Sequence, residues 1–347
     1  MVFTAILVVA FQNCSLPAFT DSASSVQAQQ SGDSSGQPYD GKIYVEAGLC
    51  PKDSTNIRSR IVLDTKTTGH VVREDCENIE PRRITSAEFT VEPVLSSQLT
   101  YRRPDGQSVI YLAERPAILI APMSSWYYQL AGVVGPRTEK VTNVDMFSHT
   151  AASIQNLKSS GSVVLCNFSA GTVETGRPDA SSFVAADRGN TADVASEQWL
   201  DTRSANVRQI MLSRLDRARS IGCDGIDFDR VDAHSNNSGF PLTRATQTEY
   251  NQFLAFAARD RKLLAGLKNA GDLVNNLVDS FDLAIVEQCH QYNECGQYQP
   301  FAQKGKAILA IEYTGRSTNQ CSSSSSSGIS LIFDTAALNG SNYQTCL

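Results

Sequence analysis

The chain has 347 residues, of which 41% are hydrophobic, and this is enough for one large domain with a smaller one. Its formal net charge is −6 and it has no Lys/Arg-rich run, so we do not expect nucleic acid as a partner. The nine cysteines form no CxxC motif and the four histidines are scattered, which argues against a zinc site or a thioredoxin-type redox site.

The first 39 residues predict export rather than a folded domain. An apolar run of about ten residues within MVFTAILVVAFQNC is too short to span a membrane and resembles a secretory signal, although positive charges before it are missing. We expect a signal peptide over 1–20 and a flexible Ser/Gln/Gly-rich linker over 21–39. Removal of the signal would leave eight cysteines, an even number compatible with disulfides in a secreted or periplasmic protein without a membrane anchor.

Residues 40–118 predict a small all-β domain, because short alternating runs occur there without a helical period. The runs are KIYVEAG, RIVLDTK, HVVRE, EFTVEPV, LTYRR and QSVIYL. The turn residues Pro104, Asp105 and Gly106 join the last two in a hairpin. Cys50 and Cys76 could crosslink the domain, which serves either for packing or spacing or for binding glycans.

Residues 119–347 alternate between strand-like apolar runs and helical periods. Eight parallel β/α units in this length fit a (β/α)8 TIM-like barrel, and a doubly wound open sheet is disfavoured because no GxGxxG follows the first strand. The Ser-rich run 321–328 predicts a mobile surface loop. The strands are expected at 125–132, 142–147, 162–171, 224–229, 263–269, 283–288, 307–313 and 328–334. The helix before the fourth strand has an apolar face of Val207, Met211, Leu215 and Ala218, and the next has one of Tyr250, Phe253, Leu254 and Ala257.

Nearly every predicted barrel strand ends in a residue that can ionise or form a hydrogen bond. Because active sites of such barrels lie at the carboxyl ends of the strands, these residues predict a polar cleft. In chain order they are Tyr128, Asp145, Glu174, Asp227, Asp229, Lys268, Asn269, Glu287, Glu312 and Tyr313.

The fourth of these strands, DGIDFDR, carries aspartates, which strands tolerate poorly. Ile226 and Phe228 alternate with Asp227 and Asp229, so the two carboxylates point to the same side. Burial of unpaired carboxylates against helices would be costly. We therefore expect both to face the barrel interior near its open mouth.

Other acidic residues have different interpretations. Asp224 and Asp232 are expected to be turn, cap or salt-bridge residues, and Asp145 is either a ligand contact or a cap. Asp229 and Glu287 end the fourth and sixth strands, and no turn motif explains them. Two carboxylates across a barrel mouth, without a metal motif or a Ser-His-Asp pattern, indicate glycoside hydrolysis without a metal or cofactor.

Ten short motifs between about residues 124 and 320 together resemble glycoside hydrolase family 114, the endo-α-1,4-polygalactosaminidases. The resemblance implies a TIM-like barrel that cleaves α-1,4-linked galactosamine polymers such as cationic exopolysaccharides, with Asp229 and Glu287 as the catalytic pair. The motifs are WYYQL, VDMF, CNFSAGTVE, RPD, WLDTR, GCDGIDFDRVD, GLKNA, VEQCHQYNEC, PFAQKGKA and IEY.

Two positions depart from the family pattern. Arg230 stands where the family usually has Asn, and Asn167 where it usually has Tyr. Arg230 could pair with a carboxylate and lower its pKa, or could repel a cationic sugar. A glycan-binding protein with weakened catalysis therefore stays open beside an active hydrolase. In the hydrolase we expect Asp229 as nucleophile and Glu287 as general acid/base with retention of configuration, inversion being the alternative.

The predicted mouth contains more carboxylates than cations. This excess favours an aminosugar polymer over a neutral or acidic one, and raised salt should weaken binding. We expect a monomer that binds this polysaccharide.

Three cysteine pairs are expected in the barrel. A Cys289–Cys295 disulfide would fix the loop that follows Glu287, and a Cys321–Cys346 disulfide would close the Ser-rich segment. Cys166 and Cys223 are either a third pair or two buried thiols.

Overall fold

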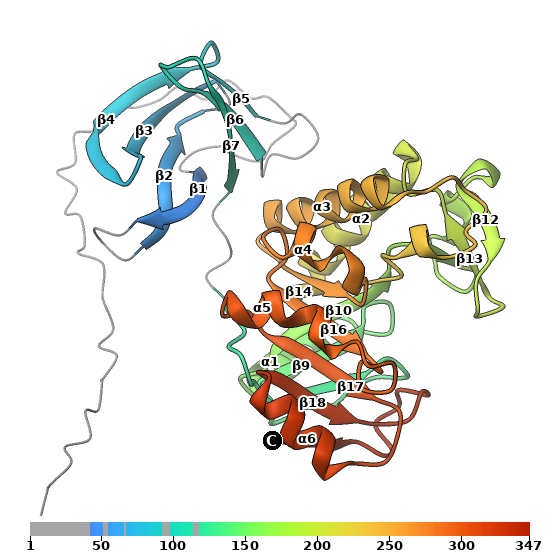
Figure 1. Cartoon of the computed structure of the whole chain (residues 1–347). Coiled ribbons are helices and arrows are strands. Elements are labelled where there is room, and N and C mark those ends of the chain that lie inside the picture. Colours follow the sequence, from blue (N-terminus) through green and yellow to red (C-terminus); the bar gives the residue numbers. More distant parts are fainter. Residues whose placement is uncertain (1–41, 51–54, 66, 92–97, 114–117) are drawn as a thin grey trace, which may run out of the picture. The chain divides into compact units, whose positions relative to one another are not determined.

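The computed structural model describes residues 42–50, 55–65, 67–91, 98–113 and 118–347. The expected signal peptide and linker lie outside these ranges. Figure 1 shows an antiparallel β part and a larger α/β part.

Residues 42–113 form a seven-stranded antiparallel sheet in the order β4-β3-β2-β1-β7-β6-β5. One cluster of buried side chains, which includes Tyr44, Ile61 and Leu99, forms its core. The predicted hairpin is confirmed, with Gly106 in its turn at a φ of 87°. The strands are β1 (Lys42–Cys50), β2 (Thr55–Leu63), β3 (Thr68–Glu74), β4 (Glu77–Thr85), β5 (Phe89–Val91), β6 (Gln98–Arg102) and β7 (Ser108–Ala113).

The sequence pattern did not reveal strand β4. Four of the nine residues in its sequence, ENIEPRRIT, are charged, and Ile84 is a fully buried hydrophobic residue in it. The strand lies at the sheet edge, where charged side chains and proline are tolerated because one side of the backbone needs no partner. Pro81 lies next to a register shift against β3.

Eight parallel strands of the α/β part follow each other in chain order, which confirms the predicted TIM-like arrangement. A short strand, β19 (Gln344–Thr345), adds antiparallel to the last of them. Each of the eight overlaps the run that predicted it. They are β8 (Trp126–Gln129), β9 (Val141–Asp145), β10 (Val163–Ser169), β14 (Gly225–Asp229), β15 (Leu264–Lys268), β16 (Leu283–Glu287), β17 (Ile308–Glu312) and β18 (Ile329–Phe333).

The first and last parallel strands meet through side chains and the C-terminal segment. In the part of the chain that the structure describes, no ladder joins β8 to β18. Instead, Trp126 Nε1 donates to the carbonyl oxygen of Ser330 at 3.0 Å, and the Tyr343 hydroxyl donates to the carbonyl oxygen of Trp126 at 2.9 Å. The backbone N–H of Leu130 donates to Leu338 O at 2.9 Å. The arrangement is thus a TIM-like half-barrel whose seam is bridged by these contacts.

Helices follow most of the strands, and the two predicted apolar helix faces are buried as expected. The first of them, Ala205–Ile221, is followed by the cap residue Gly222, whose φ of 94° suits glycine. Among the described residues, no helix is both long and apolar enough to cross a bilayer. The helices are α1 (Ala151–Ser159), α2 (Ala205–Ile221), α3 (Arg244–Asp260), α4 (Val274–Leu277), α5 (Gln299–Gln303) and α6 (Thr318–Ser326).

The expectation of a mobile loop over 321–328 is wrong, because most of this run belongs to helix α6. Ser317 caps the helix by accepting from the backbone N–H of Gln320 at 3.3 Å. Ser324 is buried, with its hydroxyl oxygen 2.7 Å from His290 Nε2. A serine run has no apolar period that would announce a helix, so tertiary contacts and a cap decide its structure.

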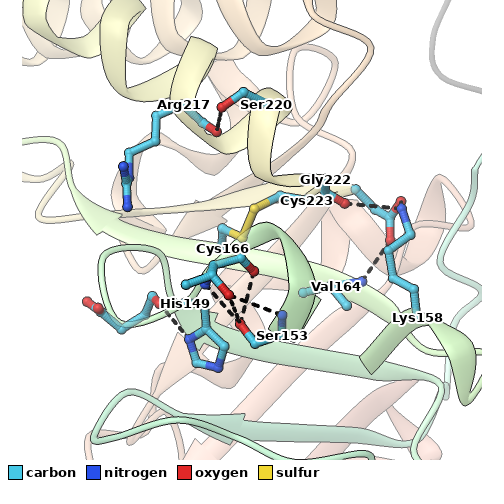
Figure 2. Close-up of a disulfide and its surroundings, with 12 residues drawn as sticks. His149, Ser153, Lys158, Val164, Cys166, Arg217, Ser220, Gly222 and Cys223 are labelled. Atoms are coloured by element: carbon cyan, nitrogen blue, oxygen red, sulfur yellow. Dashed lines mark hydrogen bonds and ion pairs between the residues drawn. A yellow bond between two sulfur atoms is a disulfide. The ribbon is translucent and has the colours of Figure 1, made fainter. Parts of the chain in front are cut away.

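All three disulfides expected in the barrel are present. Cys166–Cys223 joins strand β10 to the residue after Gly222 (Figure 2), and the others are Cys289–Cys295 and Cys321–Cys346. The side chain of Cys50 lies outside the described residues. Figure 2 also shows Lys158, which donates to the carboxylate of Asp224 at 2.6 Å. The expected salt-bridge role of Asp224 is therefore confirmed.

Candidate active site

The ammonium group of Lys268 lies between the two carboxylates that the sequence singled out. Lys268 Nζ is 3.5 Å from Asp229 Oδ1 and 3.5 Å from Glu287 Oε2. The Lys268 side chain is 1% exposed, whereas those of Asp229 and Glu287 are 27% and 22% exposed. Because both oxygens lie near one nitrogen, they are separated by no more than twice 3.5 Å.

A buried hydrogen-bond chain holds Lys268 in place from the barrel interior. Its Nζ donates to the Tyr128 hydroxyl at 2.8 Å, and that hydroxyl donates to Asp227 Oδ2 at 3.3 Å. The side-chain amides of Asn143 and Asn167 donate to the same oxygen at 2.8 and 2.9 Å. Asp227 is fully buried on the interior side of β14, and Phe228 packs in the apolar cluster on the other side, as the alternation predicted.

The charge states at this chain follow from burial and from the neighbouring charges. Burial alone would lower the pKa of Lys268, but the negative charges of Asp229 and Glu287 outweigh it and hold that pKa well above its ordinary value. Burial raises the pKa of Tyr128 and, against the attraction of Lys268, that of Asp227. Lys268 is therefore a fixed cation below the carboxylate pair.

Glu287 is held by the residues on both sides of it. Asn269 accepts from the backbone N–H of Glu287 at 2.9 Å and donates to Glu287 Oε2 at 3.4 Å. The Tyr313 hydroxyl donates a short hydrogen bond to Glu287 Oε1. Burial, and then the charge of Glu287, raise the pKa of Tyr313, so its hydroxyl keeps its proton. Asn269 and Gln288 have φ values of 48° and 56°, so the chain turns sharply directly after both strand ends.

Asp229 is held by the backbone of the next residue. Its Oδ1 accepts from the N–H of Arg230 at 3.0 Å, and Arg230 has a φ of 59°. The backbone of Gly171 packs so closely here that a Cβ on it would lie 1.7 Å from the carbonyl oxygen of Arg230. Asp229 Oδ2 has no hydrogen-bond partner among the described residues, so it is free to meet a ligand.

The Arg230 side chain pairs with acidic residues of a small antiparallel sheet that the sequence did not predict. Nη1 lies 2.8 Å from Asp193 Oδ1, and Nε lies 3.3 Å from Glu197 Oε2. The cation that pairs with Asp229 is thus Lys268, whereas the Arg230 side chain pairs with Asp193 and Glu197. The sheet consists of β11 (Thr172–Glu174), β12 (Arg188–Thr191) and β13 (Glu197–Leu200), in the order β11-β13-β12.

Asp229 and Glu287 open into a cavity of about 520 Å³ at the carboxyl ends of the strands. Its apolar wall includes Leu130 and the segment 336–338. The charged and polar residues that line it are Asp193, Glu197, Asp229, Arg230, Asp232, Lys268, Asn269, Glu287 and Tyr313. The predicted polar cleft is therefore present, with more carboxylates than cations.

Five of the predicted cleft residues do not line the cavity, and two of them, Tyr128 and Asp227, are fully buried below it. Asp145 and Glu174 both pair with Arg177, at 2.6 and 2.7 Å, and Asp145 also accepts from the backbone N–H and hydroxyl of Ser148 at 2.8 Å. Glu312 is fully buried and accepts from the backbone N–H of His290 at 2.8 Å. Asp145, Glu174 and Glu312 are the other three that do not line the cavity.

Asp193, Glu197 and Asp232 line the cavity although the sequence did not predict them there. The first two lie in or next to the unpredicted sheet. Asp232 lies in a turn, as expected, but its side chain does not cap the 3₁₀ turn Ala233–Ser235. No ion pair within the described ranges includes it, so of the expected turn, cap and salt-bridge roles the turn is the one that the structure shows.

One group of potential metal ligands occurs in the described part of the chain. The ligand atoms of Cys289, His290 and Cys295 lie within 4.8 Å of one another. The two sulfurs are joined in a disulfide, so they are not thiolate ligands.

Comparisons with known proteins find a family and similar solved structures. The sequence profile of the glycoside-hydrolase family GH114 matches residues 111–347. The crystal structure of Aspergillus fumigatus Ega3 in complex with galactosamine is similar at 36% identity over 67% of this chain and 99% of that chain, with a TM-score of 0.63. The glycoside hydrolase domain of PelA from Pseudomonas aeruginosa has the same fold at 17% identity over 62% of this chain and 96% of that chain, with a TM-score of 0.51. No curated relative matches the chain.

Proposed function

The chain belongs to glycoside hydrolase family GH114, and we propose that it is an endo-glycosidase that cleaves α-1,4-linked galactosamine polymers, with Asp229 and Glu287 as its catalytic carboxyl groups. The observation that carries this proposal is the shared position of the two groups. Both end parallel strands, both face the cavity, and both lie 3.5 Å from the same buried ammonium group. Most glycoside hydrolases use such a pair of Asp or Glu carboxyl groups.

The surroundings of the two groups support a division of roles. The N–H of Arg230 fixes Asp229 Oδ1, and the free Oδ2 is available to attack the anomeric carbon. Both oxygens of Glu287 have partners, which orient the group toward the leaving oxygen that it protonates. After the sugar is bound to Asp229, Glu287 takes a proton from the water that releases it.

Retention of configuration is part of the proposal. Retaining enzymes place their carboxyl groups about 5 to 5.5 Å apart, and inverting enzymes about 6.5 to 9.5 Å apart. Asp229 Oδ1 and Glu287 Oε2 lie no more than twice 3.5 Å apart, which admits the retaining spacing and excludes most of the inverting range.

The departures from the family pattern leave this pair intact. Arg230 is engaged by Asp193 and Glu197, and Asn167 donates to Asp227 below the cavity. Neither contact gives specific support to the alternative of a weakened glycan-binding protein.

The substrate class is supported by the charge of the cavity and by a relative. The cavity wall has more carboxyl groups than cations, which favours a cationic polymer. The similar structure of Ega3 contains galactosamine. The three disulfides are consistent with an oxidising compartment, and we include secretion in the proposal. The expected monomer stays a prediction.

Release of reducing ends from two polymers tests the proposal. The protein should cleave deacetylated α-1,4-polygalactosamine but not neutral polygalactose, and raised salt should lower the rate by screening the polymer charge. Equal cleavage of both polymers without a salt effect would contradict the substrate class, and cleavage of neither would contradict the activity.

A further inference from the structure

The cations of the cavity wall are each shared by two carboxylates. The wall contains five carboxyl groups and two cationic side chains. Lys268 lies between the two proposed catalytic groups. Arg230 lies between Asp193, at 2.8 Å, and Glu197, at 3.3 Å. The two cations therefore pair with four of the five carboxyl groups.

The fifth carboxyl group, Asp232, lacks a cationic partner within the described ranges. The hydrogen bonds of the following turn go to its backbone, because Ser235 donates to Asp232 O through its N–H at 3.0 Å and through its hydroxyl at 2.8 Å. The nearby imidazole of His234 is engaged elsewhere, with Nε2 3.0 Å from Asp272. Burial raises the pKa of Asp232 and the charge of Asp229 raises it further, and these effects outweigh the charges of Arg230 and His234, which lower it.

A half-buried carboxylate without a cation is costly, and its cost disappears when a ligand brings the missing positive charge. A ligand's cation would gain less at the four other carboxyl groups, because there it would have to compete with Lys268 or Arg230. Asp232 lines the same cavity as Asp229, so a sugar bound at the proposed nucleophile lies in the cavity that Asp232 lines.

We infer that Asp232 is the subsite for the ammonium group of an aminosugar residue. The inference rests on the proposed function and adds to it the group that selects the substrate. A protonated amine pairs with Asp232, whereas an N-acetyl group or a hydroxyl brings no charge and leaves the carboxylate uncompensated. The enzyme should therefore prefer a deacetylated residue at this position.

Binding of three monosaccharides to the whole protein tests this inference. Calorimetry or NMR titration compares galactosamine, N-acetylgalactosamine and galactose on the wild type and on Asp232→Asn. The variant should bind galactosamine about tenfold more weakly or worse, since truncation of a desolvated charge pair typically has at least this effect. Binding of the two uncharged sugars should change little.

Two further variants separate this role from general effects. Asp193→Asn removes the same charge from the same wall, but Asp193 is 72% exposed and already paired, so galactosamine binding should weaken only a few-fold. Asp232→Glu keeps the charge and should retain part of the selectivity. If Asp232→Asn fails to fold in a thermal melt, the selectivity of Asp232→Glu decides the matter.

Unchanged galactosamine binding in Asp232→Asn, an equal loss for all three sugars, or a wild type that does not prefer galactosamine would each overturn the inference. Failure of the hydrolase proposal gives a different result. In that case the protein binds galactosamine in an Asp232-dependent manner but releases no reducing ends from the polymer.

Discussion

Lys268 donates a hydrogen bond to Tyr128 inside the barrel, at 2.8 Å, although the two residues are 140 positions apart in the chain. Tyr128 is in turn bonded to the fully buried Asp227. The ammonium group therefore cannot leave the carboxylate pair without breaking a buried hydrogen bond, which is costly. This contact makes Lys268 a positioning residue rather than a mobile substrate ligand.

Replacement of Lys268 by Met should lower turnover more than binding. The ammonium group lies 3.5 Å from an oxygen of each proposed catalytic carboxyl group, and its removal leaves a buried position without the cation that holds the pair together. The variant should therefore lose about tenfold or more in kcat. Lys304→Met, at an exposed ion pair with Asp279, is the control and should keep its kcat. A kcat of Lys268→Met equal to that of the control would contradict the role of Lys268.

Replacement of Asp227 by Asn should change how stability depends on pH. Burial raises the pKa of Asp227 in the folded protein, so the folded state holds this proton more tightly than the unfolded state. The stability contributed by the protonated group is complete below its unfolded pKa and declines as pH rises through the folded pKa. The unfolding free energy of the wild type minus that of Asp227→Asn should therefore fall over this window. Denaturant titrations at several pH values measure it, and a rising difference would refute the raised pKa.

Removal of the Tyr313 hydroxyl should lower turnover more than binding. A hydrogen bond to a charged group contributes roughly 1.5 to 3 kcal/mol, so Tyr313→Phe should lower kcat by about 10- to 100-fold with KM little changed. Tyr250→Phe is a matched control, because its hydroxyl donates to the carbonyl oxygen of Ala170 and not to a cavity residue. That control should affect stability rather than kcat. Equal effects of the two changes on kcat would exclude a specific role for Tyr313.

A methyl group on Gly171 should disturb the proposed nucleophile through the backbone. The added Cβ would lie 1.7 Å from the carbonyl oxygen of Arg230, so Arg230 must move, and its N–H with it. Gly171→Ala should therefore lose most activity in steady-state assays. Gly176→Ala, where a Cβ meets nothing within 4 Å, should keep it. Full activity of Gly171→Ala would show that the position of Arg230 does not matter for Asp229.

The barrel strands could be predicted because most are apolar runs of the right length that alternate with helical periods. Their ends could be predicted to carry the site because parallel strands end at one face. Strand position does not reveal which cation a carboxylate meets. Asp145 and Glu174 are both strand-end acids, yet both meet Arg177 and leave the cavity wall. Asp224 and Asp232 look alike in sequence, but only Asp224 meets a lysine, from helix α1. Such partners come from segments distant in sequence, which local patterns do not contain.

The central claim is that Asp229 and Glu287 carry out the hydrolysis. Its most direct measurement is the turnover of deacetylated α-1,4-polygalactosamine by Asp229→Asn and Glu287→Gln, with oligomer binding and thermal unfolding measured on the same samples. Asp224→Asn is the control, because Asp224 pairs with Lys158 and accepts from the backbone of Val164, away from the cavity. Both site variants should fold, bind oligomer and lose several orders of magnitude in turnover, whereas the control should lose stability. Turnover near that of the wild type in either site variant would contradict the account.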